Sequence, residues 1–290
     1  MTFTTRFAPS PTGPLHLGHA YSALLAFDLA RAQGGRFLLR IEDIDKGRAR
    51  TEWEAQIFDD LRWLGLDWPE PVMRQSERLD QYRAALEPLW QQGLLFACSC
   101  SRRDVRAAAS APQEGGDPVT GPDGIVYPGT CRDRDVRTGS SALPAGCALR
   151  LNMARAVARA APLTFVEEGG ETSRTDTVDP ESAVRGIGDV VLARPDMGTS
   201  YHLSVVLDDA AQGVTHVVRG ADLFEATGIH VILQRLLGLQ TPIYHHHRLI
   251  RDDTGKRLAK RDDARALAKY RAEGASPNDI RRMVGLPPGQ

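Results

Sequence analysis

The chain has 290 residues, with 42% hydrophobic and 25% charged residues, which is typical of a soluble globular protein with one large core or two smaller ones. Its net charge of −1 excludes a global attraction to nucleic acid, so such a partner would need a local basic patch. The N-terminus lacks a basic-then-apolar signal, and no apolar run is long enough to span a bilayer, which predicts a cytoplasmic protein.

The first predicted elements are an extended segment at 4–8, a Pro- and Gly-rich loop, and a helix from Gly18 to the break at 34–35. The unpaired N–H groups at the start of such a helix favour phosphate binding. His16 and His19 flank this start, where their ring N–H groups could donate to phosphate oxygens, and Gly18 would let a flat base approach the backbone. An isolated H-x-G-H motif is equally compatible with a turn that carries two surface histidines.

A buried strand is predicted at 36–41, and it ends at the acidic segment 42–45. Ligands of parallel α/β sheets bind beyond the carboxyl ends of the strands, so these carboxylates are candidates to contact a cationic group. A solvated acidic turn is the competing interpretation. Two amphipathic helices are predicted next, at about 49–64 and at 77–92, with Ser76 as the cap of the second.

Three clustered cysteines, Cys98, Cys100 and Cys131, favour a tetrahedral zinc site in a chain with too few cysteines for a disulfide framework. The spacing leaves the fourth ligand open between Tyr127, Cys147 and water. The alternative is three unrelated buried thiols. The intervening segment 107–123, rich in Ala, Gly, Pro and Asp, predicts a mobile surface loop.

The following stretch predicts the second half of a parallel sheet, separated from the first by the metal-bearing insertion. This half consists of predicted strands at 188–194 and 215–219 and predicted helices at 201–211 and 222–237. Two further predicted strands, 148–153 and 163–166, and a predicted loop at 167–179 precede it.

The C-terminal part begins with a predicted strand at 243–250 that contains His245, His246 and His247. Because alternate residues of a strand face opposite sides, a polar strand edge is favoured over a metal site. A cationic loop at 256–261 follows, then a helix that begins near Asp263 and a last helix capped by Ser276.

Together these motifs resemble the class I aminoacyl-tRNA synthetases, whose HIGH and KMSKS signatures are matched by residues 16–19 and 257–261. Within this family, residues 6–13, 40–45 and 75–78 look like the glutamate-specific branch. Fewer than thirty residues follow Arg261, too few for the anticodon-binding region of a glutamyl-tRNA synthetase. The chain therefore resembles the truncated relatives that attach glutamate to the queuosine base of tRNA(Asp).

The resemblance implies an α/β fold with a Rossmann-type class I synthetase catalytic domain, a zinc-bearing insertion and a short C-terminal helical part, without an anticodon-binding domain. We expect residues 1–97 and 187–240 to form the two halves of the catalytic domain. Residues 98–186 would form the insertion, an acceptor-type subdomain, and residues 241–290 the lysine loop with the short C-terminal helices.

The resemblance also implies the site residues. Glutamate would bind Arg6, Phe7, Ala8, Pro9, Ser10, Glu42, Tyr201 and Arg219. ATP would bind His16, Gly18, His19, Arg257 and Lys260, with His16, His19 and Lys260 as the catalytic groups. One structural Zn²⁺ would bind Cys98, Cys100, Tyr127 and Cys131, which leaves Cys147 unassigned, and Mg²⁺ would accompany ATP. The implied partners are ATP, L-glutamate and queuosine-containing tRNA(Asp), with no membrane. We expect a monomer because no dimerisation element is evident.

The implied reaction has two steps: glutamate attacks the α-phosphate of ATP, and a hydroxyl of the queuosine cyclopentene ring then attacks the adenylate. Arg257 and Ala259 stand where the family has Lys and Ser, so we expect a loop that depends chiefly on Lys260. Three alternatives stay open: a compact glutamyl-tRNA synthetase that charges a 3′ end, a small-molecule adenylating enzyme, and a non-catalytic tRNA-binding relative. The basic clusters at 102–106 and 248–261 would bind an RNA backbone in the tRNA-dependent cases, or be ordinary solvated surface.

Overall fold

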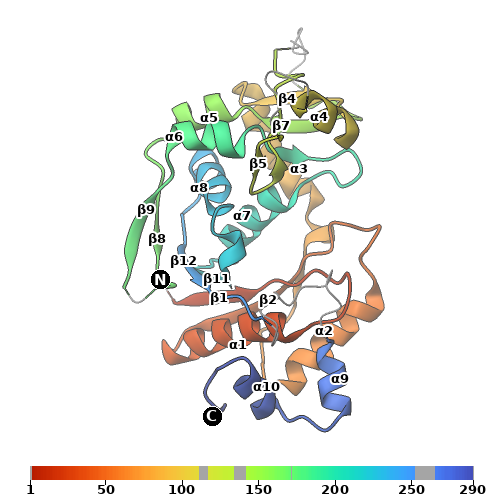
Figure 1. Cartoon of the computed structure of the whole chain (residues 1–290), viewed down its shortest axis with the longest axis vertical. Coiled ribbons are helices and arrows are strands. Elements are labelled where there is room, and N and C mark those ends of the chain that lie inside the picture. Colours follow the sequence, from red (N-terminus) through yellow and green to blue (C-terminus); the bar gives the residue numbers. More distant parts are fainter. Residues whose placement is uncertain (1, 111–116, 134–141, 171, 252–264, 290) are drawn as a thin grey trace.

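The computed structural model describes residues 2–110, 117–133, 142–170, 172–251 and 265–289. A central layer of two mainly parallel sheets lies between two groups of elements (Figure 1). The insertion with strands β4 and β7 lies at one end of the molecule, and helices α1, α9 and α10 lie at the other.

The first half of this layer is built by local β-α-β connection. Strand β1 (Thr4–Phe7) pairs in parallel with β2 (Arg36–Ile41), and β2 pairs in parallel with β3 (Met73–Arg74). Helix α1 (Leu17–Ala32) joins β1 to β2 and buries Leu24 and Phe27 against the sheet. The predicted strand at 36–41 is confirmed residue for residue, and α1 begins one residue before the predicted start.

The second half is a separate four-stranded sheet that lies beside the first. A backbone hydrogen bond of 3.0 Å from Thr215 N to Thr4 O places β11 (His216–Gly220) beside β1. Strand β12 (Ile243–His247) lies between β11 and β8 (Thr164–Glu167) and is parallel to both, while β9 (Arg174–Thr177) pairs antiparallel with β8 at the edge. The carboxyl ends of β1, β2, β11 and β12 therefore meet at one edge of the two sheets.

Helices cover the sheet and close its two ends. They are α2 (Thr51–Trp63), α3 (Leu79–Gln91), α7 (Tyr201–Ala211), α8 (Thr227–Leu236), α9 (Leu267–Ala272) and α10 (Pro277–Met283). Short helical turns occupy Gln75–Glu77, Pro180–Ser182, Ala183–Ile187 and Ala221–Leu223. Ser200 caps α7, and Ser276 caps α10, the latter as predicted. No helix of the described ranges is long and apolar enough to cross a bilayer.

The insertion has its own small antiparallel sheet, in which β7 (Ala148–Leu151) lies between β4 (Leu95–Cys98) and β10 (Val191–Ala193). Helix α4 (Arg102–Ala109), helix α5 (Met153–Ala160) and the hairpin of β5 (Thr120–Gly121) and β6 (Gly124–Ile125) complete it.

Several expectations for these parts are wrong. The predicted strand at 188–194 does not join the parallel sheet, because β10 pairs antiparallel with β7. The segment 107–123 is not loop throughout, because it contains the end of α4 and one strand of the hairpin. Within the predicted loop 167–179, residues 174–177 form the edge strand β9.

Two further expectations are wrong, one because of the hydrogen-bond partner of Ser76 and one because of the neighbours of β12. Ser76 does not cap α3, because its N–H and hydroxyl both donate to Asp43, at 2.8 and 2.6 Å. The three histidines at 245–247 do not lie at a strand edge, because β12 has a neighbour on each side.

Candidate active site

The loop that joins β1 to α1 ends in a cap formed by two histidines. The backbone N–H of Gly18 donates to Nδ1 of His16 at 3.1 Å, and the N–H of His16 donates to Nδ1 of His19 at 3.2 Å. The two rings stack with centroids 3.8 Å apart. Because both Nδ1 atoms accept, a neutral ring carries its proton on Nε2, which is a donor of the type that phosphate oxygens accept.

This cap opens onto a cavity of about 360 Å³ at the carboxyl ends of the strands. Its walls bring together most of the residues that sequence motifs proposed for glutamate and ATP: Arg6, Phe7, Ala8, His16, Gly18, His19, Glu42, Tyr201 and Arg219. Pro9 is absent from these walls, and its carbonyl accepts the N–H of Glu42 at 3.0 Å. Ser10 lines a second cavity instead.

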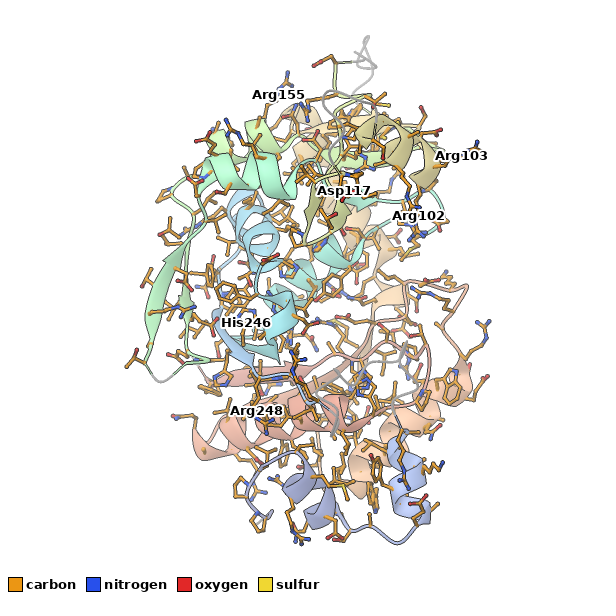
Figure 2. All side chains as sticks on the ribbon, in the orientation of Figure 1. Arg102, Arg103, Asp117, Arg155, His246 and Arg248 are labelled. Atoms are coloured by element: carbon orange, nitrogen blue, oxygen red, sulfur yellow. The ribbon has the colours of Figure 1, made fainter. Side chains whose placement is uncertain are left out.

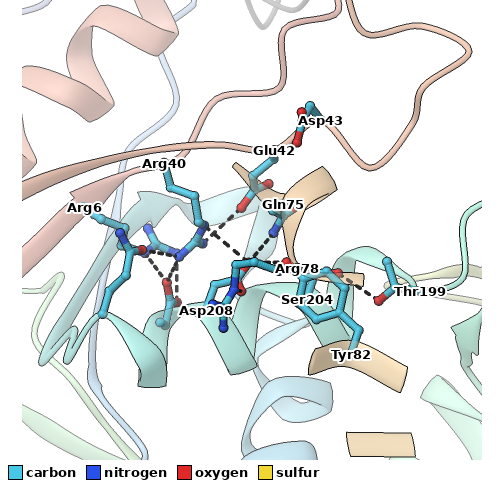
Figure 3. A network of polar contacts seen from close by, with 12 residues as sticks. Arg6, Arg40, Glu42, Asp43, Gln75, Arg78, Tyr82, Thr199, Ser204 and Asp208 are labelled. Atoms are coloured by element: carbon cyan, nitrogen blue, oxygen red, sulfur yellow. Dashed lines mark hydrogen bonds and ion pairs between the residues drawn. The ribbon is translucent and has the colours of Figure 1, made fainter. Parts of the chain in front are cut away.

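A buried polar network forms the floor below Glu42 (Figure 3). Arg6 donates to both oxygens of Asp209, at 3.0 and 3.2 Å, and Arg40 donates to Asp209 at 2.6 Å and to Glu42 at 3.1 Å. The adjacent Asp208 accepts from Arg78 at 2.7 Å, and from Gln75 and Tyr82 at 2.9 and 2.8 Å. Three guanidinium groups thus face three carboxylates, so the network is close to neutral.

The network fixes the position of Glu42 and perturbs its carboxyl group. Burial raises the pKa of Glu42, and this effect outweighs the opposing attraction of Arg40 and Arg6. Asp209 shows the opposite balance: burial opposes ionisation, but Arg6 and Arg40 together hold its pKa below the ordinary value. The sequence interpretation included Arg6 and Glu42 but missed Asp208 and Asp209, whose signal was an acidic pair that follows the apolar run Val205–Leu207 within one helix.

Arg219 lies at the end of β11 in a different environment. Its side chain is 5% exposed, and its guanidinium donates to His246, His230, Thr227 and the carbonyl of Leu223. Within the described part of the chain, none of these partners is a carboxylate. A buried cation whose hydrogen-bond partners are all neutral is suited to bind an anionic group of a ligand.

The chain on both sides of the predicted lysine loop reaches the same cavity. Ile250 lines it, and after the loop Ala266 forms a β-bridge with His16 while Leu267 N donates to Leu15 O at 2.8 Å. Arg257 and Lys260, predicted for ATP, lie outside the described residues.

The cysteine cluster lies in the insertion, away from this cavity. Cys98, Cys100 and Cys131 offer sulfur atoms within 4.8 Å of one another. The hydroxyl oxygen of Tyr127 lies 3.4 Å from the sulfur of Cys98 and 3.5 Å from that of Cys100. Tetrahedral zinc with Zn–S bonds of about 2.3 Å separates its sulfur ligands by about 3.8 Å, so these donors fit the ion.

The pKa values within the cluster differ, because burial raises the pKa of Cys100 and of Tyr127, whereas that of Cys131 is lowered. Burial opposes ionisation of Cys131, but hydrogen bonds from Tyr127 and neighbouring groups lower its pKa to about 6. Cys147 is outside the cluster, and burial raises its pKa.

A second and larger cavity, of about 1140 Å³, separates the insertion from the first half of the sheet. It shares Glu42, Tyr201 and Leu223 with the first cavity, so the two adjoin. Five arginines are among its lining residues: Arg48, Arg102, Arg106, Arg150 and Arg194.

Comparisons with known proteins agree with this architecture. A family model described as "tRNA synthetases class I (E and Q), catalytic domain" matches residues 2–120 and 165–287. The chain is 67% identical over 283 residues to a glutamyl-Q tRNA(Asp) synthetase of Rhodobacter capsulatus, covering 97% of this chain and 99% of the relative. A protein of the same name from Nocardia farcinica is 44% identical, with 98% and 85% covered.

Among solved structures, a glutamate tRNA ligase from Elizabethkingia meningosepticum in complex with its amino acid aligns with a TM-score of 0.73 at 27% identity. The alignment covers 98% of this chain, and the chain spans 60% of that ligase's length.

Proposed function

The chain belongs to the class I tRNA synthetases of the glutamate and glutamine group, and from this membership we propose that it is a ligase that activates glutamate with ATP and transfers it to the queuosine base of tRNA(Asp). One observation carries the proposal: a buried arginine without a carboxylate partner in the described ranges and a histidine-capped helix start meet in one cavity. The near-complete alignment with the Rhodobacter capsulatus relative supports the acceptor. The reaction takes place in the cytoplasm, where ATP and tRNA are present.

In the first step the α-carboxylate of glutamate attacks the α-phosphate of ATP, forming the mixed anhydride and releasing pyrophosphate. Arg219 binds the side-chain carboxylate and Glu42 the α-ammonium group, so the nucleophile faces the nucleotide. His16 and His19 donate to the phosphates, and Lys260 neutralises the charge that develops on the leaving pyrophosphate. Mg²⁺ accompanies ATP.

In the second step a hydroxyl of the queuosine ring attacks the anhydride carbonyl, which expels AMP and leaves an ester. The second cavity is the entry for the anticodon loop, because it adjoins the first at Glu42 and Tyr201 and because its arginines suit phosphates. Cys98, Cys100, Cys131 and Tyr127 would hold zinc in a structural site, and Cys100 lines the second cavity, so the ion would stabilise one wall of it.

The test is transfer of labelled glutamate, with ATP, to queuosine-containing tRNA(Asp), queuosine-free tRNA(Asp) and tRNA(Glu). Label on the queuosine-containing species alone is the expected result. Label on tRNA(Glu) irrespective of queuosine would make the chain a compact glutamyl-tRNA synthetase, and no label on any tRNA would favour a non-catalytic relative.

Two neighbouring arginines of α4 test the proposed entry (Figure 2). Arg102 lines the second cavity and Arg103 does not. Arg102→Gln should raise the KM for tRNA several-fold and leave glutamate activation unchanged, whereas the same change at Arg103 should have little effect on either. Equal effects of the two substitutions would contradict this placement.

A further inference from the structure

Arg219 is held by four acceptors from three elements of the fold: β12, α8 and the helical turn Ala221–Leu223. Its Nε donates to Nε2 of His246 at 3.0 Å, and its Nη1 donates to Nδ1 of His230 at 2.9 Å. Its Nη2 donates to Thr227 Oγ1 at 2.8 Å and to the carbonyl of Leu223 at 3.3 Å. A guanidinium has five N–H groups, so these bonds fix its plane and leave one Nη1–H for a ligand.

The bonds to Arg219 decide where the two histidines carry their protons. Arginine only donates, so Nε2 of His246 and Nδ1 of His230 must both be unprotonated acceptors. Each neutral ring therefore carries its proton on the other nitrogen, and that nitrogen needs an acceptor of its own.

Glu167 is the acceptor behind His246, which lies near the centre of the molecule (Figure 2). Oε2 of Glu167 lies 2.5 Å from Nδ1 of His246. Oε1 accepts two backbone N–H groups, from His246 at 2.9 Å and from Gly169 at 2.7 Å. The carboxylate is thus fixed by the end of its own strand and by β12, and it is buried with the histidine.

A longer chain of the same kind lies behind His230. Nε2 of His230 lies 3.2 Å from Nδ1 of His202, and Nε2 of His202 lies 3.3 Å from Oδ1 of Asp123. Asp123 belongs to the turn of the insertion hairpin and lines the second cavity. Each group therefore donates a hydrogen bond to the next: Arg219 to His230, His230 to His202, and His202 to Asp123 at the second cavity.

We propose that Glu167 and Asp123 are positioning residues for glutamate recognition. Glu167 fixes the tautomer of His246, and Asp123 fixes the tautomers of the His230–His202 pair. His246 and His230 then both present acceptors to Arg219, which aims its remaining N–H at the side-chain carboxylate of the substrate. The inference rests on the proposed function. It adds a link between the hairpin that borders the second cavity and the residue that binds the amino acid.

The substitution Glu167→Gln tests this directly because it keeps the shape of the side chain. The two backbone N–H groups hold the amide oxygen at the Oε1 position, so the amide NH₂ faces Nδ1 of His246. The histidine must then move its proton to Nε2, where it opposes the Nε–H of Arg219. Glu168→Gln is the matched control, because it removes the same charge one residue further along.

The assay is glutamate-dependent pyrophosphate exchange in the presence of tRNA(Asp). Glu167→Gln should raise the KM for glutamate by about tenfold or more, the scale of a lost hydrogen bond to a charged group, with the KM for ATP nearly unchanged. Glu168→Gln should change neither. Asp123→Asn should give a smaller rise in the KM for glutamate, because its carboxylate is partly exposed and its bond is longer.

Substitutions of His246 separate hydrogen bonding from packing. His246→Gln offers an oxygen to Arg219 and an NH₂ to Glu167, so it should retain most of the glutamate affinity, whereas His246→Leu should lose it. Equal losses in both variants, or an unchanged KM for glutamate in Glu167→Gln, would overturn the proposal.

Nitrogen NMR of the labelled imidazoles gives a readout that does not depend on activity. The wild-type chain should show His246 protonated on Nδ1, and Glu167→Gln should show it protonated on Nε2. The opposite wild-type tautomer would refute the positioning role even in an active enzyme. A wild-type chain with the expected tautomer but no glutamate activation would instead contradict the proposed function.

Discussion

Asp209 is the carboxylate that joins Arg6 to Arg40 in the buried network. It lies on α7 with an 8% exposed side chain and accepts three hydrogen bonds from Arg6 and Arg40. Asp209→Asn would leave three guanidinium groups against two carboxylates, and the new NH₂ would face one of those guanidinium groups. Removing one partner of a buried ion pair costs about 3–5 kcal/mol of unfolding free energy.

For a chain of this size, that loss corresponds to a fall in Tm of about 6–20 °C. The measurement is thermal and urea unfolding of Asp209→Asn beside Asp196→Asn. Asp196 pairs with Arg194 at the surface, so its substitution should change the unfolding free energy by only about 0.5 kcal/mol.

A second substitution tests the charge argument. Arg6→Gln restores the balance of charges in the Asp209→Asn background, so the double variant should lose less stability than the sum of the two single variants. Additive losses, or an Asp209→Asn variant as stable as the surface control, would refute the reasoning.

Three other predictions follow from the site. Lys260→Ala should slow adenylate formation strongly in steady-state kinetics, and near-normal rates would contradict its role at the leaving pyrophosphate. Cys131→Ser should abolish bound zinc in metal analysis and lower the Tm, whereas Cys147→Ser should retain the metal. Burial and Arg219 lower the pKa of His246 to about 4, against 6.5 for an ordinary histidine. Between these two pH values the unfolded chain binds a proton that the folded chain does not, so the unfolding free energy should fall as the pH drops from 6.5 towards 4. His246→Gln should flatten that part of the profile of Tm against pH.

The elements near the N-terminus were predictable because their signals are local. The apolar strand at 36–41, the Pro- and Gly-rich loop and the capped helix after it each depend on neighbouring residues. The same holds for α10, where Ser276, Pro277 and Asp279 specify the helix start.

The insertion was predicted less well because its structure depends on distant partners. Helix α5 buries Met153, Ala156, Val157 and Ala160, which is a helical spacing. The predicted strand at 148–153 included Met153, so this spacing was not recognised. Strand β9 is polar and exposed, and only pairing with β8 makes it a strand.

The site residues likewise fall into those with a local sequence signal and those whose position depends on distant partners. His16, Glu42 and Arg219 stand in motifs or at predicted strand ends, so sequence placed them near one another. His246 was predicted at a strand edge because its partners, Glu167 and Arg219, are 79 and 27 residues away along the chain. Arg40, inside the apolar strand 36–41, was the available signal for the network, since a buried charge requires partners.

Glu42, Tyr201 and Leu223 are common to both cavities, and this has a consequence for the fate of the intermediate. A mixed anhydride hydrolyses in bulk water, and each hydrolysis wastes one ATP. Because the two cavities share these residues, the activated carbonyl would form beside the cavity of the acceptor, so the intermediate need not leave the protein between the two reactions. Substitutions that open this shared wall to water should therefore lower the number of esters formed per ATP consumed. This ratio should fall before the rate of either reaction does.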